Sequence, residues 1–284
     1  MQLNSKYFND AQIQEQLVKP VVSFGTGGIV YAPKKWVGRN VILSLPKELS
    51  IDEKIFNSLK PNLAHVLGIF LTGSFARGEQ SEKSDIDALV VADKKFIPLK
   101  QQNLDITVIE LNALKNSLKK TPIMFYPMLL EAKPIFNELL LHELRKTRIN
   151  FSNFKWFFDS SEQSVKTIRE FVDDEKSNGH KFFESRAAVY SLILRLKGLY
   201  LIKCIIAKKS FLFSEFRKFL LKSGISDGSF DNFLDVYKSE RDEKKSKIKI
   251  RLAEAVTLLI FLANQINKTS ALIKNVKKIN QKRN

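Results

Sequence analysis

Three aspartates in the first half of the chain have the residue type and spacing that metal chemistry requires. Asp85 and Asp87 flank Ile86 in a stretch of strand-like composition, and side chains at positions i and i+2 of a strand share one face. Two neighbouring carboxylates repel each other, and a divalent cation such as Mg²⁺ relieves that repulsion. Asp105 lies in the next apolar stretch, where a charge is out of place unless that strand pairs beside the first. Three such carboxylates can hold two metal ions for an in-line phosphoryl displacement, and Asp105 could also take the acceptor's proton.

A glycine and a serine precede these aspartates at the end of another apolar stretch, residues 66–72. Gly73-Ser74 predicts a tight turn or a helix start, where backbone N–H groups face an anion. Glycine lets a ligand approach the backbone closely, and the serine hydroxyl adds one donor. A triphosphate is the natural ligand for such a turn.

The order and spacing of these residues resemble a known signature. Gly73-Ser74, ten further residues and then Asp85-Ile86-Asp87 resemble the motif of the DNA polymerase β-like nucleotidyltransferase superfamily, and most of all its minimal nucleotidyltransferase branch. The resemblance covers residues 66–110. It implies an NTP substrate, two Mg²⁺ ions, and catalytic and metal-binding roles for Asp85, Asp87 and Asp105. The nucleotide-binding residues that it implies are Gly73, Ser74, Arg77 and Ser84, although Arg77 could equally be a solvated charge.

The elements that must position these residues form three successive regions. We predict an α+β fold with a β-rich N-terminal element (residues 1–48), a nucleotidyltransferase core with a mixed sheet (52–137) and an all-α bundle (138–284). In the core, the pattern predicts a helix at 52–63 and strands at 66–72, 86–91, 104–109 and 132–136. In the bundle, it predicts helices near 138–148, 160–176, 181–207, 213–222, 229–240 and 248–280.

The N-terminal element contains short β-branched and aromatic runs punctuated by glycine, with turns expected at residues 25–28 and 37–40. Its Tyr-x-Pro-Lys-x-Trp-x-Gly stretch, residues 31–38, resembles transposon-associated proteins related to AbrB-type swapped-hairpin domains. That resemblance implies a homodimer and a nucleic-acid-binding face formed by Lys34, Lys35 and Arg39. A small β appendage packed on the catalytic core is the alternative.

The C-terminal region resembles the HEPN-type helical domains that accompany minimal nucleotidyltransferases, through residues 185–200 and 235–242. HEPN ribonucleases have an arginine followed by four to six residues and a histidine. Here Arg241 is followed by Asp-Glu-Lys-Lys-Ser-Lys, and the last histidine in the chain is His180. We therefore expect substrate binding or dimerisation rather than ribonuclease activity, with a plain helical cap as the alternative.

The charge of the chain points to a polyanionic partner. The formal net charge is +17, and residues 151–284 contribute +12 of it from 27 basic and 15 acidic side chains. Within residues 244–251, the basic side chains Lys244, Lys245 and Lys247 are candidates for nucleic-acid contacts, or belong to a solvated helix. The most apolar helical stretch, residues 187–207, carries three basic residues, so we expect no membrane span. The N-terminus has no apolar leader, and a single cysteine suits a reducing, cytoplasmic compartment.

These observations favour a Mg²⁺-dependent nucleotidyltransferase. We expect it to move a nucleoside monophosphate from an NTP, with ATP favoured, to an acceptor hydroxyl on RNA, protein or a small molecule. The alternative is a nucleic-acid-binding regulator or antitoxin-like protein whose nucleotidyltransferase core only binds nucleotide. Three mutually repelling carboxylates argue for the enzyme, because binding alone gives no reason to keep them together.

Overall fold

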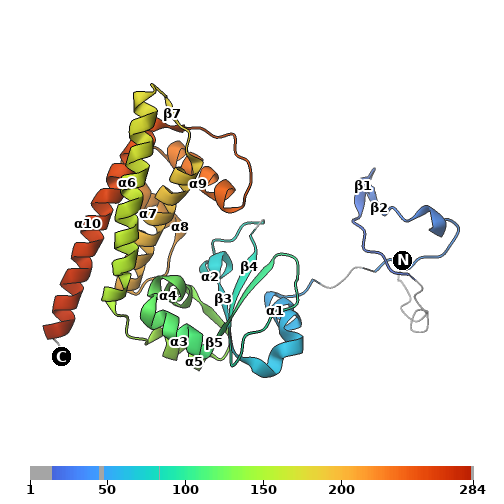
Figure 1. Ribbon diagram of the computed structural model, residues 1–284. Helices are drawn as coiled ribbons and strands as arrows, with labels where there is room; N and C mark the ends of the chain where they lie inside the picture. Colours follow the sequence, from blue (N-terminus) through green and yellow to red (C-terminus); the bar gives the residue numbers. More distant parts are fainter. Residues whose placement is uncertain (1–14, 45–47, 83, 283–284) are drawn as a thin grey trace. The chain divides into compact units, whose positions relative to one another are not determined.

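The computed structural model describes residues 15–44, 48–82 and 84–282, and these residues form an α+β protein (Figure 1). The chain divides into two compact units, residues 1–48 and 49–284. The second unit contains both the sheet that carries the aspartates and the long helices. The sequence-based boundary between a core ending at residue 137 and a bundle starting at residue 138 stays a prediction.

The N-terminal unit is built on a β-hairpin, as its glycine pattern predicted. Strands β1 (Val22–Phe24) and β2 (Gly27–Ile29) pair antiparallel with Phe24 opposite Gly27, so Gly25 and Thr26 form a two-residue turn. Gly25 has a φ of +56°, which glycine adopts without steric cost. A short 3₁₀ helix, η2 (Lys34–Trp36), follows the hairpin.

Four strands form the mixed sheet of the second unit, in the order β5-β4-β3-β6. β3 (Val66–Thr72) pairs antiparallel with β4 (Ile86–Ala92) and with β6 (Lys133–Phe136), whereas β4 and β5 (Leu104–Glu110) run parallel. The four predicted strands are therefore present within one residue at each end. Two short strands, β7 (Phe182–Phe183) and β8 (Ile250–Arg251), form a separate ladder that the sequence pattern did not indicate.

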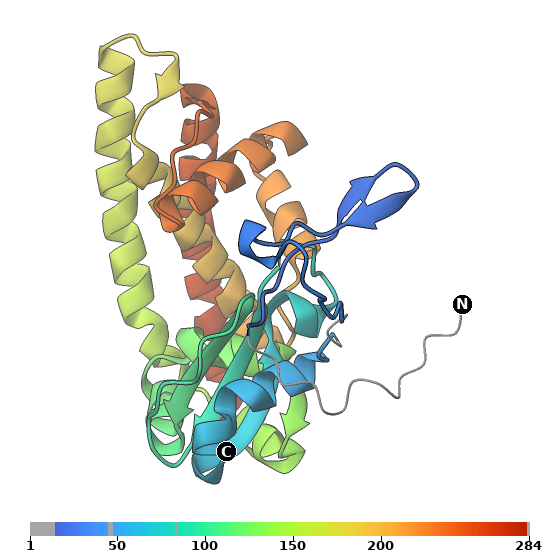
Figure 2. The ribbon, with the colours of Figure 1, turned by 90° about the vertical axis from the view of Figure 1, so that its right-hand side faces the viewer.

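Both faces of the two central strands are buried, which explains why they read as unbroken apolar runs. On one face, Ile69 and Val90 pack with helix α1 (Ile51–Leu59), which lies in front of the sheet in Figure 2. On the other, Phe70 and Leu89 belong to the large core shared with the helices. Ser50 caps α1 in a capping box with Glu53, and the predicted longer helix ends as a 3₁₀ turn, η3 (Lys60–His65).

Two helices between β5 and β6 were not predicted. α3 (Leu111–Lys120) and α4 (Pro122–Glu131) follow β5 directly, and Thr121 separates them. Pro122 stands in the first turn of α4, where a proline costs no hydrogen bond. The apolar run of α4 lacks helical periodicity because the helix is packed against α3, α5 and α7.

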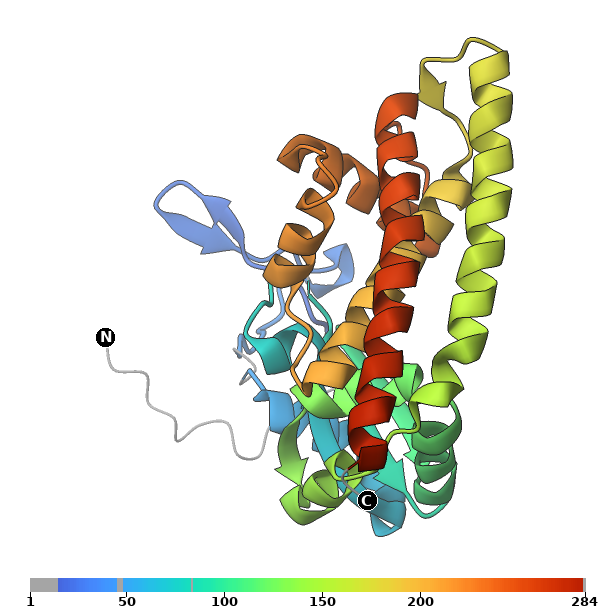
Figure 3. The same cartoon turned by 90° about the vertical axis from the view of Figure 1, so that its left-hand side faces the viewer.

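The remaining helices form the bundle, with bounds within about five residues of those predicted. They are α5 (Glu138–Arg145), the 3₁₀ turn η4 (Phe151–Phe154), α6 (Lys155–Ser177), α7 (Arg186–Ala207), α8 (Phe213–Leu221), α9 (Asp227–Arg241) and α10 (Leu252–Lys282). Figure 3 shows α10 and α6 running alongside each other, and α7 packs against both.

Within the described residues, one helical stretch is long and apolar enough to cross a membrane. It is Leu252–Asn275 in α10, not the 187–207 stretch that the sequence analysis singled out. Several of its apolar side chains, among them Leu258, Leu262 and Ile266, are buried in the core shared with α6 and α7. Core helices of soluble proteins have the same composition, so the stretch does not indicate a membrane protein.

Candidate active site

The parallel pairing of β4 and β5 brings two of the three predicted aspartates side by side. Asp87 lies directly opposite Asp105 in the strand register, as the prediction of neighbouring strands required. Asp87 is partly buried and Asp105 is exposed. Asp85 immediately precedes β4 and is exposed, so the three carboxylates share one end of the strand pair.

The negative charges at this end of the sheet affect one another. Burial, and then the charge of Asp105, raise the pKa of Asp87 to about 6 from an ordinary value of 3.8. Asp85 and Glu131 add smaller contributions in the same direction, and Arg77 opposes them. A cation placed here would relieve this excess of negative charge, and carboxylate oxygens are ligands that suit Mg²⁺. Among the described residues, however, no three such side chains are gathered closely enough to form a ready-made metal cage.

Gly73 and Asp87 are in such close contact that the glycine cannot be replaced without displacing the carboxylate. Gly73 has a φ of +67°, and a Cβ built on it would lie 1.9 Å from Asp87 Oδ2. The predicted helix start after β3 is present as α2 (Gly73–Arg77), a single five-residue turn. It ends at Gly78, whose left-handed conformation lets its N–H bond the Ser74 carbonyl.

A small cavity of about 110 Å³ opens between β3, the paired strands β4 and β5, and α4. Its lining includes Gly73, Asp87 and Asp105, so it contains three of the predicted site residues. It also includes Thr72, whose buried hydroxyl has no hydrogen-bond partner among the described residues. An unpartnered buried hydroxyl beside two carboxylates suits a polar ligand.

A second hollow, of about 560 Å³, is lined by residues of α1 and α2 and by the segment that leads into β4. Ser84 lines it, together with Lys54, Phe75 and Asn103. The Ser84 hydroxyl accepts a hydrogen bond from the Ser81 amide at 2.9 Å. Of the predicted nucleotide-binding residues, the structure thus places Gly73 and Ser84 in two different hollows, whereas Ser74 lines neither of them.

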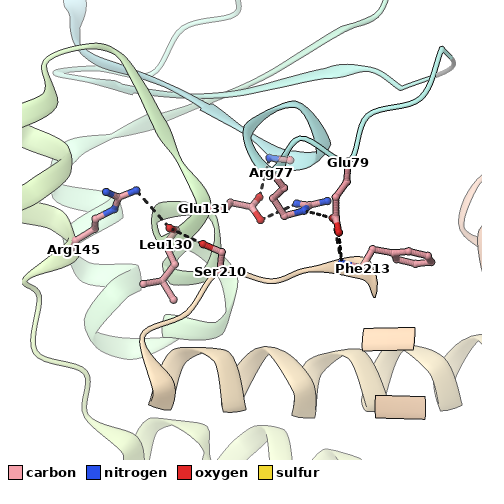
Figure 4. A network of polar contacts seen from close by, with 8 residues as sticks. Arg77, Glu79, Leu130, Glu131, Arg145, Ser210 and Phe213 are labelled. Carbon is pink, nitrogen blue, oxygen red and sulfur yellow. Dashed lines mark hydrogen bonds and ion pairs between the residues drawn. The ribbon is translucent and has the colours of Figure 1, made fainter. Parts of the chain in front are cut away.

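Glu131, at the end of α4, is a site residue that sequence reasoning missed. Its Oε1 accepts a hydrogen bond from the Gly73 amide at 2.8 Å, and its Oε2 pairs with Arg77 at 2.8 Å (Figure 4). Its side chain is only 8% exposed, and burial raises its pKa even though Arg77 opposes the shift. The expectation of a free glycine N–H therefore needs correction, because Glu131 already occupies it. In the sequence, Glu131 is recognisable only as an acidic residue directly after the apolar run 122–130. No spacing rule connects an acid at that position with Gly73.

Arg77 is an integral part of this network. Its Nε donates to Glu79 at 2.9 Å, and its guanidinium lies 5.5 Å from the centre of the Phe211 ring. Glu79 in turn accepts the backbone N–H of Phe213, the first residue of α8, at 2.9 Å. Arg77 is therefore neither a solvated charge nor wholly free for phosphate: in this structure it links the glycine turn to the helical bundle.

The predicted nucleic-acid contacts lie away from these carboxylates in the sequence and occupy exposed positions. In the N-terminal unit, Lys34 and Arg39 are exposed and Lys35 pairs with Glu15 at 2.8 Å. In the second unit, Lys244, Lys245 and Lys247 lie in the exposed loop between α9 and β8 rather than in a helix. Their role stays a prediction.

Comparison with known proteins identifies the domain that carries the three aspartates. Residues 52–146 match the profile of the nucleotidyltransferase domain family. No curated protein sequence matches the chain. Two solved structures are similar at low TM-scores. A spectinomycin adenyltransferase from Enterococcus faecialis, solved with ATP and spectinomycin, has 16% identity and a TM-score of 0.41, covering 75% of this chain and 97% of its own. A nucleotidyltransferase-like protein from Exiguobacterium sibiricum has 13% identity and a TM-score of 0.34, covering 76% and 73%.

The profile match spans the whole sheet, helices α1 to α4 and the start of the bundle, and thus includes every aspartate of the site. Residues 52–146 therefore form a nucleotidyltransferase domain.

Proposed function

We propose that the chain transfers a nucleoside monophosphate from an NTP, most favourably ATP, to an acceptor hydroxyl and releases pyrophosphate. The observation that carries the proposal is the pairing of Asp87 with Asp105 beside Gly73, within residues that match the nucleotidyltransferase profile. The acceptor oxygen forms the new bond to the α-phosphorus, and the bond between that phosphorus and the pyrophosphate oxygen breaks. The acceptor hydroxyl loses its proton in the same step.

Each residue has a distinct part in this proposal. Asp85 and Asp87 would hold Mg²⁺, with Asp105 as the third carboxylate. Bound there, the metal ions would offset the charge of the triphosphate and orient the acceptor oxygen. Asp105 is exposed and close to the cavity, which suits it to accept the proton of the acceptor. Ser74 adds a hydroxyl donor for the phosphates.

The Gly73 amide and Arg77 are the two groups with which Glu131 now pairs. A triphosphate that contacts either group must compete with the Glu131 carboxylate for it. Glu131 is therefore a positioning residue, because it holds the glycine turn and the arginine at a fixed separation before the nucleotide arrives.

A direct assay tests the proposal. The purified chain is incubated with Mg²⁺ and each of the four α-labelled NTPs in a lysate treated with nuclease or with protease, and labelled products are separated. We expect transfer from ATP, lost in Asp85→Ala combined with Asp87→Ala. The matched control is Asp173→Ala on the exposed side of α6, which should keep full transfer. Transfer that survives the double substitution would contradict the assignment.

The flanking regions extend the proposal. The N-terminal hairpin unit would dimerise and contact nucleic acid through Lys34, Lys35 and Arg39, and the bundle would be a HEPN-like module without ribonuclease activity. The buried thiol of Cys204, whose pKa burial raises to about 11, suits a reducing cytoplasm. Lys34→Ala combined with Arg39→Ala should abolish duplex DNA binding without affecting nucleotide transfer.

A further inference from the structure

Thr72, the last residue of β3, has a buried hydroxyl that no other described residue satisfies. The residue is only 1% exposed, and its Oγ1 has no hydrogen-bond partner in the part of the chain that the structure describes. Burying an unpaired hydroxyl costs free energy, whereas a valine of nearly the same shape would not carry that cost. The rest of β3 is Val-Leu-Gly-Ile-Phe-Leu, so packing alone does not account for a hydroxyl at its end.

Helix capping does not account for the hydroxyl either. Thr72 is the N-cap of α2, a position that threonine favours because its side-chain oxygen accepts a backbone N–H of the first turn. Here the side chain forms no such hydrogen bond, and the amide of Gly73 donates to Glu131 instead. The hydroxyl is therefore available to the cavity of about 110 Å³, which Thr72 lines together with Asp87 and Asp105.

The strand register places Thr72 beside one of these two carboxylates. Thr72 lies opposite Asp87 in the antiparallel pair of β3 and β4, and Asp87 lies opposite Asp105 in the parallel pair of β4 and β5. Side chains directly opposite each other share a face, and in an antiparallel pair their Cβ atoms are about 4.5–5.5 Å apart. The three side chains thus form a row with Asp87 in the middle. Asp105 is two strand spacings from Thr72, about 10 Å, so Asp87 is the aspartate that the hydroxyl can reach.

Asp87 is also a carboxylate without a hydrogen-bond donor. Glu131, the other acid beside Gly73, has both oxygens engaged, one by the Gly73 amide and one by Arg77. Asp87 accepts no hydrogen bond from the described residues. A carboxylate has two oxygens, and a donor that holds one of them fixes the direction of the other. Carboxylates that bind metal ions are commonly held by hydrogen bonds of this kind.

We infer that Thr72 is a positioning residue, whose hydroxyl donates to Asp87 on the side away from Asp105 and so directs the other oxygen towards Asp105 and a shared metal ion. The inference rests on the proposed function and deepens it, because Thr72 lies outside the glycine, serine and aspartate motif. The hydroxyl has no partner in this structure, so the bond forms only when the carboxylate rotates. Thr72 therefore lowers the stability of the metal-free chain and strengthens metal binding.

Metal binding and stability are measured separately, and neither measurement needs nucleotide transfer. The probe is Mn²⁺ in place of Mg²⁺, because the electron paramagnetic resonance signal of free Mn²⁺ reports how much metal stays unbound. The full-length chain carries Thr72→Val, which removes the hydroxyl at nearly constant shape, or Thr72→Ser, which keeps it. The matched control is Thr269→Val in α10, because Thr269 is also buried with an unpartnered hydroxyl but lies in the bundle. Urea unfolding in EDTA gives the stability of each variant.

We expect Thr72→Val to bind Mn²⁺ about tenfold more weakly than the unsubstituted chain, which is the effect of one hydrogen bond to a charged group. Thr72→Ser should stay within about threefold, because it keeps the donor, and Thr269→Val within about twofold. In EDTA, Thr72→Val and Thr269→Val should both unfold at urea concentrations no lower than the unsubstituted chain, since each loses an unpaired hydroxyl. A loss of metal affinity without a loss of stability separates a positioning role from a structural one.

Several outcomes overturn the inference. They are Mn²⁺ affinity that is unchanged in Thr72→Val, equally lowered in Thr269→Val, or as weak in Thr72→Ser as in Thr72→Val. Unfolding of Thr72→Val at a lower urea concentration in EDTA would show a structural partner for the hydroxyl and also overturn it, as would an unsubstituted chain that binds no Mn²⁺ at millimolar concentration.

The proposed function and this inference fail in different ways. If no NTP is transferred to any acceptor but Mn²⁺ binding depends on the Thr72 hydroxyl, the proposed function fails and the inference stands. If label is transferred but Mn²⁺ binding is the same with threonine and valine at position 72, the proposed function stands and the inference fails.

Discussion

Replacing Asp87 by asparagine should stabilise the metal-free protein while abolishing nucleotide transfer. The Asp87 carboxylate accepts no hydrogen bond from the described residues, and it is crowded by Asp105, Asp85 and Glu131. Its pKa is about 6 in the folded chain against 3.8 in an unfolded one. Ionising Asp87 therefore opposes folding, and the neutral amide of asparagine removes that cost without changing the volume beside Gly73.

The magnitude follows from the pKa difference. A shift of about two pH units corresponds to about 3 kcal/mol, and screening by solvent at a partly exposed group reduces this to about 1–3 kcal/mol. The cost is absent below about pH 3, where both states bind the proton, and grows as the unfolded state ionises first. It is complete above about pH 7, where both states are ionised. For a folded domain of about 150–250 residues, this free energy corresponds to a rise in the melting temperature at pH 7 of about 2–10 °C.

Urea unfolding in EDTA between pH 3 and pH 8 measures this difference. The free energy of unfolding of the Asp87→Asn variant should equal that of the unsubstituted chain at about pH 3 and exceed it at about pH 7. The control is Asp173→Asn, an exposed aspartate of α6 that should show no pH-dependent difference. Mg²⁺ should then stabilise the unsubstituted chain more than the Asp87 variant. Equal stability of the two chains at pH 7, or a difference independent of pH, would refute the reasoning.

Three further substitutions test the packing around the site. Glu131→Gln removes one of the two charged partners of Arg77 and leaves Glu79 as the other, so the free energy of unfolding should fall by about 1–3 kcal/mol in urea unfolding. Gly73→Ala places a methyl group against the Asp87 carboxylate, so nucleotide transfer should be lost. Gly179→Ala is the control, because Gly179 also has a positive φ but lies in open space, and this variant should keep nucleotide transfer. Gly198→Ala places a Cβ 2.3 Å from Phe157 in the bundle core and should lower stability by about 1–3 kcal/mol in thermal unfolding, without altering the KM for ATP.

The sheet and the aspartates could be predicted from sequence because they depend on short-range patterns. The apolar runs 66–72 and 86–91 are continuous because both faces of β3 and β4 are buried, and Asp105 was recognisable as a charge in an apolar strand. α4 was missed because its buried, proline-containing run has no helical period. Glu131 could not be predicted, since its contact with Gly73 joins residues 58 positions apart and depends on how α4 packs.

The hydrogen bond between Glu79 and the Phe213 amide makes the active-site turn and helix α8 thermodynamically linked. Glu79 also holds Arg77, so any ligand that draws Arg77 away alters the anchor at the first turn of α8. Linkage is reciprocal: a ligand that fixes the far end of α8 changes the affinity of the turn for its own ligand by the same factor. Amide hydrogen exchange at Phe213 is therefore a reporter of site occupancy that needs no turnover.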